Sequence, residues 1–224
     1  MQVYIAGSGK LASELLQHLG AQGDFSIAPW PPGQDVAERA VVVHAGSGRE
    51  IGEISRFCTR TSSVLVELAT GSLLESKQPY HPVVLCPNTN ILMLKFMCML
   101  ERSGSLFSGA KISVLESHQA TKSSVPGTAV SIANSLRVAA SEIVSVRDVV
   151  EQELNLGILS DHLARHAFHR VVIQDASCSI SMETRIFGKN PYVSGVKQII
   201  DAISARDLEP RSYSINEFIE NAWV

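Results

Sequence analysis

The stretch Val3-Tyr4-Ile5-Ala6-Gly7-Ser8-Gly9-Lys10-Leu11-Ala12 decides the fold of the first part of the chain. Its apolar run predicts a buried strand, and the leucine spacing over 11–19 predicts a helix after the glycine turn. Gly7 suits a tight turn, Gly9 lets the backbone approach a pyrophosphate, and Ala12 is small enough for helix–strand packing. This order of elements indicates nucleotide binding, with a plain structural turn as the alternative.

Three further apolar runs, at 41–43, 64–66 and 83–85, each lead into a turn of small or polar residues. Such strands, separated by polar segments, predict a parallel sheet covered on both faces. Ligands bind beyond the carboxyl ends of the strands in sheets of this kind, so the four turns are expected to line one crevice. The predicted cofactor-binding residues are Gly7, Ser8, Gly9, Lys10, Leu11, His44, Ala45, Gly46, Ala69, Thr70, Gly71, Pro87, Asn88 and Thr89.

The whole chain is expected to have an α/β fold with two domains. Residues 1–90 and 194–224 are predicted to form an abbreviated Rossmann-like dinucleotide-binding domain, with a strand at 25–27 and only a short segment before the next strand. Residues 91–193 are predicted to form a smaller α+β domain for substrate binding and oligomerisation. A final helix over 193–203 is expected to pack back on the first domain.

The composition of the 224-residue chain, with 45% hydrophobic and 18% charged residues, is ordinary for a globular protein. A net charge of −3 argues against a nucleic-acid-binding protein. No apolar run reaches the ~18 residues that span a bilayer, and the first residues do not resemble a signal peptide. Four widely spaced cysteines suggest reduced thiols. We therefore expect a cytoplasmic protein with no membrane partner.

A second informative stretch is Glu116-Ser117-His118-Gln119-Ala120-Thr121-Lys122-Ser123-Ser124-Val125-Pro126-Gly127-Thr128-Ala129. It follows an apolar strand pattern and leads into helical spacing over 130–136. A helix N-terminus binds carboxylate or phosphate through its free N–H groups, Lys122 adds positive charge, and His118 can donate a proton. Together they suit an anionic substrate that must be protonated. The alternative is a polar connection in which Thr128 only caps a helix.

A third pattern is formed by His162, His166 and His169, whose spacing would place them on one helical face beside Asp161. Histidines four residues apart can share a metal ion, but a polar face or a subunit contact is the preferred interpretation, so no metal is predicted. The remaining histidines outside the motifs, His18 and His81, are expected at the surface.

The second stretch resembles the signature of dihydrodipicolinate (4-hydroxy-tetrahydrodipicolinate) reductases of lysine and diaminopimelate biosynthesis, roughly E-x-H-H-x-x-K-x-D-x-P-S-G-T-A. The matching residues are Glu116, His118, Lys122, Pro126, Gly127, Thr128 and Ala129. The chain departs from the signature at Gln119, where the family has a second His, and at Ser124, where it usually has Asp. It also lacks the Ser between Pro126 and Gly127.

The resemblance implies an oxidoreductase that transfers a hydride from NADPH or NADH to a cyclic imine carboxylate, which is then protonated. It implies catalytic roles for His118 and Lys122, and substrate binding by Gln119, Gly127 and Thr128. Lys10 stands where the family often places a basic residue that faces a 2′-phosphate. The family usually forms tetramers through the sheet of the second domain, for which the strand at 177–185 is the candidate.

Two other functions stay open at this point. One is a non-catalytic NAD(P)H-binding protein that kept the fold but lost the chemistry. The other is an amino-acid dehydrogenase of the aspartate type, which would place no special demand on the turn at 126–128. Because Gln119 can donate a hydrogen bond but carries no charge, an imine other than dihydrodipicolinate also fits the sequence.

Overall fold

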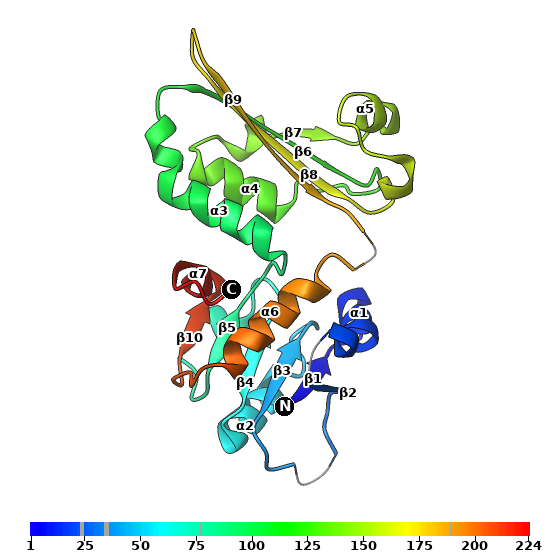
Figure 1. The fold of residues 1–224 in the computed structure, drawn as a ribbon, viewed down its shortest axis with the longest axis vertical. Coiled ribbons are helices and arrows are strands. Elements are labelled where there is room, and N and C mark those ends of the chain that lie inside the picture. Colours follow the sequence, from blue (N-terminus) through cyan, green and yellow to red (C-terminus); the bar gives the residue numbers. More distant parts are fainter. Residues whose placement is uncertain (23–24, 34–35, 77, 189) are drawn as a thin grey trace. The chain divides into compact units, whose positions relative to one another are not determined.

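The computed structural model describes residues 1–22, 25–33, 36–76, 78–188 and 190–224. The chain divides into two compact units (Figure 1). The first unit consists of Met1–Leu94 and Tyr192–Val224, and the second unit of Lys95–Pro191. Among the described residues, no helix has the length and apolar character needed to cross a membrane.

A parallel sheet forms the centre of the first unit, as the sequence predicts. Its strands within the described residues are β1 (Gln2–Ala6), β2 (Ser26–Pro29), β3 (Ala40–His44), β4 (Val64–Glu67), β5 (Val83–Leu85) and β10 (Ser212–Ser214). The strand order is β10-β5-β4-β3-β1-β2, and neighbouring strands pair in parallel. The apolar runs at 41–43, 64–66 and 83–85 all lie in this sheet, so the strand predictions are confirmed.

Helices cover both faces of this sheet. The elements outside the strands are α1 (Lys10–His18), η1 (Gly20–Gln22), α2 (Ile51–Thr61), η2 (Leu73–Ser76), α6 (Val193–Ser204) and α7 (Ile215–Glu220). One core cluster joins α1 and α6 to one face, and a second cluster joins α2 to the other. Gly195 of α6 lies so close to the turn after β5 that a Cβ atom would be 1.6 Å from the Thr89 carbonyl oxygen. The predicted packing of the final helix on the first unit is therefore confirmed.

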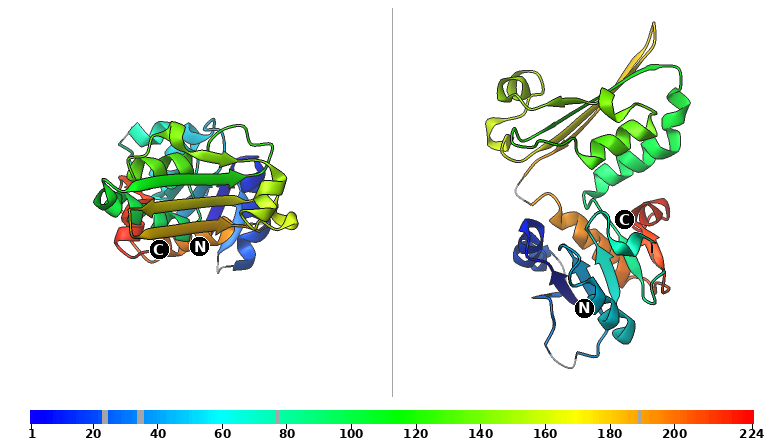
Figure 2. Two further views of the ribbon diagram at one scale, coloured as in Figure 1. Left: turned by 90° about the horizontal axis from the view of Figure 1, so that it is seen from above. Right: turned by 180° about the vertical axis from the view of Figure 1, so that it is seen from behind.

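A mixed sheet forms the second unit (Figure 2). Its strands are β6 (Lys111–His118), β7 (Val144–Val146), β8 (Ala167–Gln174) and β9 (Ser179–Ile186), in the order β7-β6-β8-β9. The helical elements are α3 (Ile91–Ser103), which starts in the first unit, η3 (Gly104–Phe107), α4 (Gly127–Ser135), η4 (Ala140–Glu142), α5 (Val149–Leu154) and η5 (Ser160–His162). Strand β7 runs parallel to β6, whereas β8 runs antiparallel to β6 and to β9.

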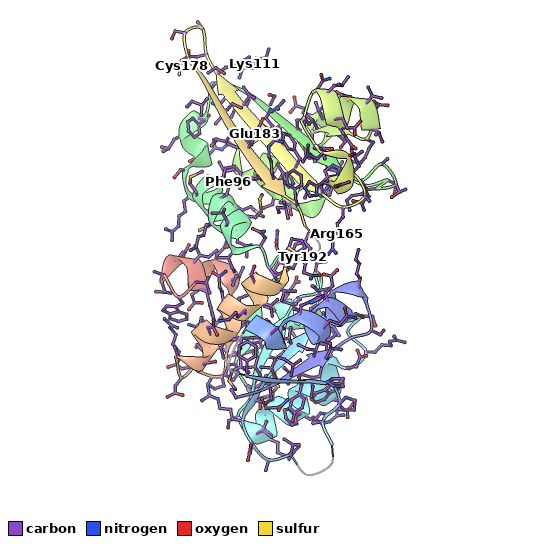
Figure 3. The ribbon with its side chains drawn as sticks, turned by 45° about the vertical axis from the view of Figure 1, so that its right-hand side comes forward. Phe96, Lys111, Arg165, Cys178, Glu183 and Tyr192 are labelled. Carbon is purple, nitrogen blue, oxygen red and sulfur yellow. The ribbon has the colours of Figure 1, made fainter. Side chains whose placement is uncertain are left out.

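Strands β8 and β9 form a long hairpin with Cys178 near its turn, while Glu183 lies along β9 (Figure 3). The Glu183 carboxylate pairs with Arg170 at 2.6 Å and with Arg185 at 2.8 Å. Both guanidinium groups lie over the buried Phe168 ring, at 5.3 Å and 4.9 Å from its centroid. The strand expected at 177–185 is thus β9, at the edge of the sheet; its role in oligomerisation stays a prediction.

Candidate functional site

The glycine turn after β1 has the geometry that a pyrophosphate-binding turn requires. Gly7 has a φ of +122°, and a Cβ atom there would lie 2.5 Å from the Ala45 carbonyl oxygen, so no other residue fits. Helix α1 begins at Lys10, and its N-cap, Gly9, makes no side-chain cap hydrogen bond. The N–H groups of its first turn have no carbonyl partner within the helix and can therefore bind an anion.

The four turns predicted to bind a cofactor lie at one edge of the sheet, because β1, β3, β4 and β5 are parallel neighbours. Backbone hydrogen bonds extend the sheet into these turns, as between the Ala45 N–H and the Ala6 carbonyl at 2.8 Å. Their contact with a cofactor stays a prediction. The structure brings together the predicted residues at 7–11, 44–46, 69–71 and 87–89.

His44, predicted in a flexible cofactor turn, instead has a completely buried side chain. Its Nδ1 lies 2.8 Å from Oε1 of Glu67, which is also buried. Glu67 further accepts hydrogen bonds from the Ala69 N–H at 2.9 Å and from the Ser72 hydroxyl at 3.1 Å. Any cofactor contact at position 44 must therefore come from the backbone. Sequence reasoning missed Glu67, although a charged residue within an apolar strand pattern was a usable signal.

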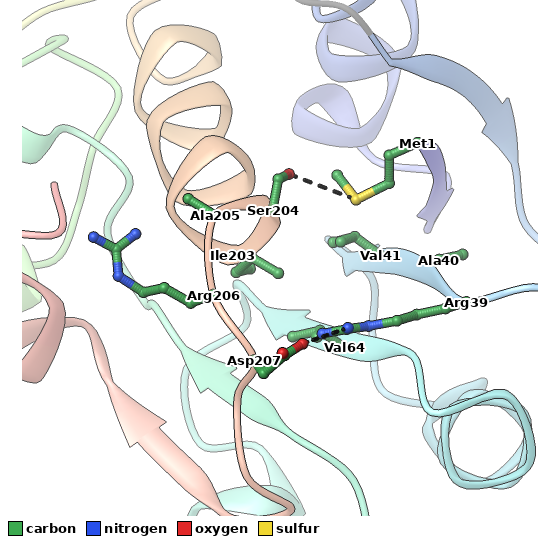
Figure 4. Close-up of a pocket in the computed structure, with 10 residues that line it drawn as sticks. All are labelled: Met1, Arg39, Ala40, Val41, Val64, Ile203, Ser204, Ala205, Arg206 and Asp207. Atoms are coloured by element: carbon green, nitrogen blue, oxygen red, sulfur yellow. Dashed lines mark hydrogen bonds and ion pairs between the residues drawn. The ribbon is translucent and has the colours of Figure 1, made fainter.

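A small pocket of about 300 Å³ lies at the opposite edge of the same sheet (Figure 4). Met1, Ala40 and Val64 line it at the amino ends of their strands, beside the ion pair between Arg39 and Asp207 at 3.0 Å. Because ligands of parallel sheets bind beyond the carboxyl ends of the strands, this pocket is not the predicted cofactor crevice.

In the second unit, His118 at the end of β6 is held by a buried ion pair. Its Nδ1 lies 2.8 Å from Oε2 of Glu116, and Arg147 donates to both oxygens of that carboxylate, at 2.6 Å and 3.2 Å. Burial raises the pKa of Glu116, but hydrogen bonds from His118 and Arg147 outweigh it and lower the pKa to about 2. The ionised carboxylate only accepts, so Nδ1 carries a proton and Nε2 is the nitrogen that can exchange one.

Arg147 also holds the loop that carries Lys122. Its Nε donates to the Lys122 carbonyl at 2.9 Å, and the Lys122 N–H donates to the Gln119 carbonyl at 2.9 Å. The Lys122 side chain is partly exposed and makes no ion pair with any residue that the structure describes. The predicted residues Gln119 and Lys122 therefore lie in one ordered turn directly after His118. No local sequence signal identified Arg147, since Lys122 and Glu116, the site residues that it binds, are 25 and 31 residues away.

Helix α4 begins at Gly127 and presents an open N-terminus. Its N-cap is Pro126, which makes no side-chain cap hydrogen bond, and Thr128 is the second residue of the helix. The alternative in which Thr128 caps the helix is therefore wrong. The first N–H with a backbone partner in the helix is that of Val130, bonded to the Pro126 carbonyl at 3.2 Å, so the preceding N–H groups can bind a carboxylate.

The prediction that His162, His166 and His169 share a helical face is wrong. His162 ends the short η5, whereas His169 lies within β8, where the pairing places it opposite Glu116. The spacing of the three histidines was outweighed by the β-branched and aromatic residues of 168–173, which favour a strand. No cluster of metal-ligating side chains is present in the described part of the chain.

Two of these histidines nevertheless lie beside His118. The ring centroids of His166 and His169 are 6.4 Å and 5.8 Å from that of His118. Burial lowers the pKa of both, with the charge of His118 adding to the effect, and the pKa of His169 falls to about 4. Both rings are therefore neutral at neutral pH, and they surround His118 without adding charge.

Comparison with known proteins gives matches over part of the sequence and almost all of the fold. No family model matches the chain. A probable 4-hydroxy-tetrahydrodipicolinate reductase 1 (chloroplastic) of Oryza sativa subsp. japonica is 34% identical over 104 residues, which cover 43% of this chain and 30% of that protein. The 4-hydroxy-tetrahydrodipicolinate reductase 1 (chloroplastic) of Arabidopsis thaliana is 29% identical over 112 residues, covering 47% and 31%. The match thus spans less than a third of these relatives.

The similarity in structure extends further. A dipicolinate-bound dihydrodipicolinate reductase from Paenisporosarcina sp. TG-14 has a TM-score of 0.70 at 15% identity, covering 96% of this chain and 97% of that one. A meso-dapdh variant from Clostridium tetani E88 has a TM-score of 0.55 at 8% identity, covering 100% and 96%. These structures share the fold of this chain. The predicted resemblance to the dihydrodipicolinate reductase family is confirmed.

Proposed function

We propose that this protein is an NAD(P)H-dependent reductase of a cyclic imine carboxylate, with dihydrodipicolinate or a related imine as its substrate. The observation that carries this proposal is the fixed His118: the ionised Glu116 orients its ring and leaves Nε2 as the proton donor. The same carboxylate binds Arg147, which positions the loop of Lys122. The sequence and fold similarity to dihydrodipicolinate reductases supports this reading.

The first unit would hold the cofactor, whose bound nicotinamide supplies the hydride. The open start of α1 suits its pyrophosphate, because a Cβ at the N-cap Gly9 would have no protein atom beyond its chain neighbours within 4 Å and the first N–H groups of the helix are uncapped. Lys10, at the start of α1, would face a 2′-phosphate, which favours NADPH. Glu67 would fix the turn at 69–71, which the family resemblance places beside the nicotinamide ring.

The second unit would bind the substrate and protonate it. The N–H groups of Gly127 and Thr128 would hold a carboxylate at the start of α4. Lys122 would stabilise the negative charge that builds up on the substrate during reduction. His118 would then donate a proton from Nε2, and Gln119 would donate a neutral hydrogen bond where the family has a second histidine.

The test is oxidation of NADPH or NADH by freshly generated dihydrodipicolinate, with His118→Gln and Lys122→Met compared with the wild type. Lys111→Met is the matched control, because Lys111 is an exposed lysine at the other end of β6. Loss of a general acid costs about 10²–10⁴-fold in rate and loss of one charge-stabilising donor about 10²–10³-fold, so each site variant should lose at least ~100-fold and the control should lose nothing.

The two alternative functions predict different results when cofactor binding and the reverse reaction are measured with the same variants. A non-catalytic nucleotide-binding protein would bind NAD(P)H with equal affinity in all three variants and show no turnover. An aspartate-type dehydrogenase would reduce NAD(P)+ with an amino acid. Either result would overturn the proposal.

We also propose an assembly and a location for this protein. A homotetramer or dimer through the sheet of the second unit would use β9, which lies at the sheet edge. Sedimentation of the wild type and of Ser181→Pro, a change in the middle of β9, tests this arrangement, and an unchanged molecular mass would contradict it. The cytoplasmic location remains a prediction.

A further inference from the structure

A second cavity, of about 650 Å³, lies on the first unit beside α2. None of the predicted cofactor residues lines it, so it is separate from the cofactor edge. A volume of this size is within the range of small-molecule sites. Its lining residues are Gly48, Ile51, Gly52, Ser55, Arg56, Thr59, Arg60, Leu73, Leu74, Gln78, Pro79, Tyr80 and His81.

The cavity lies where the described part of the connection between β4 and β5 has no α-helix. A crossover between parallel strands usually contains an α-helix that covers the sheet. Here the described part of the connection contains only the short η2, and its remaining residues run past the flank of α2. The space beside α2 that a crossover helix would fill is therefore left as a cavity, with Leu74 and Ile51 buried at its base.

The lining combines apolar surface with positive charge. Leu73 and Tyr80 are 68% and 87% exposed, so they offer a ligand apolar surface that now contacts water. Arg56 and Arg60 also line the cavity, and the described lining residues include no aspartate or glutamate. This combination favours an apolar molecule with one negative charge.

His81 forms a buried part of this wall. Contrary to the predicted surface position, His81 is only 4% exposed. Its Nδ1 lies 3.2 Å from the Thr59 hydroxyl, while its Nε2 is buried and has no partner among the described residues. This nitrogen is enclosed and not open to the cavity, so His81 contributes packed surface to the wall and the polar contact of a ligand falls to the other lining residues.

We propose that this cavity binds a small organic acid with an aromatic or branched apolar body and a single carboxylate. The apolar body packs against Leu73, Leu74 and Tyr80. The carboxylate faces the guanidinium of Arg56. This site is independent of the reductase site, and its occupancy does not require the reductase activity.

The experiment uses the full chain and naphthalene-2-carboxylate as the probe, with binding followed by calorimetry and by amide chemical shifts. Naphthalene-2-carboxamide is the matched neutral probe. The carboxylate should bind in the micromolar to low millimolar range, and the carboxamide should bind roughly tenfold more weakly. The shifted amides should include those of Gly52, Ser55 and Tyr80.

Three variants separate this site from non-specific binding. R56Q should weaken carboxylate binding by roughly tenfold and leave carboxamide binding unchanged. L73D changes an exposed residue and should weaken carboxylate binding by a similar factor without loss of folding. R39Q is the control, since Arg39 is an exposed arginine outside this cavity. Equal affinity for the two probes, an effect of R39Q as large as that of R56Q, or shifted amides elsewhere would overturn the proposal.

Discussion

Each unit contains a buried glutamate whose carboxylate lies 2.8 Å from Nδ1 of a histidine, but the two pairs differ in what they leave open. In the first unit the side chain of His44 is completely buried beside Glu67, and its Nε2 is enclosed. In the second unit the side chain of His118 keeps 14% of its surface exposed beside Glu116. Access to the second ring nitrogen therefore separates an acid–base histidine from a structural one.

The other partners of the two glutamates also differ, since those of Glu67 are neutral and Glu116 has a charged one. Glu67 binds neutral donors, the Ala69 N–H and the Ser72 hydroxyl, and so fixes a turn. Glu116 binds the charged guanidinium of Arg147, which reaches the loop of Lys122. We therefore expect variants of the first pair to affect stability and cofactor affinity, and variants of His118 to affect turnover.

The largest effect on stability is expected from R147M. R147M removes the guanidinium partner of the buried Glu116, which keeps its hydrogen bond with His118. Loss of one partner of a buried ion pair costs about 3–5 kcal/mol of unfolding free energy. The control is R170M, because Arg170 pairs with Glu183 at a partly exposed site, where such pairs contribute about 0–1 kcal/mol. Denaturant unfolding of both variants checks this difference, and equal losses would contradict the buried role of Arg147.

A smaller effect is expected from E67Q. The amide keeps the size of the side chain but accepts fewer hydrogen bonds, so the loss is about 1–3 kcal/mol. NAD(P)H affinity should also fall, because the turn at 69–71 loses its support. The control is E75Q, since the exposed Glu75 accepts from N–H groups of the same turn, at 2.8 Å and 3.2 Å. A larger loss in E75Q than in E67Q would show that burial of Glu67 is not what fixes the turn.

A third effect is the pH dependence of stability in the second unit. His169 has its pKa lowered from 6.5 to about 4 by burial, so its contribution is complete above pH 6.5 and is lost as the pH falls toward 4. Glu116 has its pKa lowered from 4.5 to about 2, so its contribution is complete above pH 4.5 and is lost toward pH 2. H169Q should reduce the pH dependence of the unfolding free energy only between pH 4 and pH 6.5, where His169 titrates. If the pH dependence in that window stays the same in H169Q, His169 is not a buried, neutral group.

The fold could be predicted from the sequence wherever the residues of a single segment determine its secondary structure. The valine-rich runs at 41–43 and 64–66 are buried on both sides and read as parallel strands without knowledge of their neighbours. Strand β10 was missed because Ser212-Tyr213-Ser214 contains a single apolar residue, and its pairing with β5 comes from distant chain segments. The histidine spacing of 162–169 failed since three residues cannot establish a helical period against a β-forming run.

The candidate site was predictable to a similar extent. His118, Lys122 and the helix start at Gly127 are local in sequence and were identified from it. Arg147 and Glu67 were not, because their roles depend on tertiary contacts with residues far along the chain or on burial. The error at His81 and the unexpected burial of the His44 side chain have the same cause, because both side chains are enclosed by elements that no local pattern reveals.

The most direct test of the account compares H44Q and H118Q in two assays, NADPH oxidation with dihydrodipicolinate and thermal unfolding. The account predicts that H118Q unfolds close to the wild-type temperature and loses at least ~100-fold in turnover. It predicts the reverse for H44Q, a lower unfolding temperature with turnover retained by the folded protein. Wild-type turnover in H118Q would contradict the central claim that His118 is the proton donor of an imine reductase.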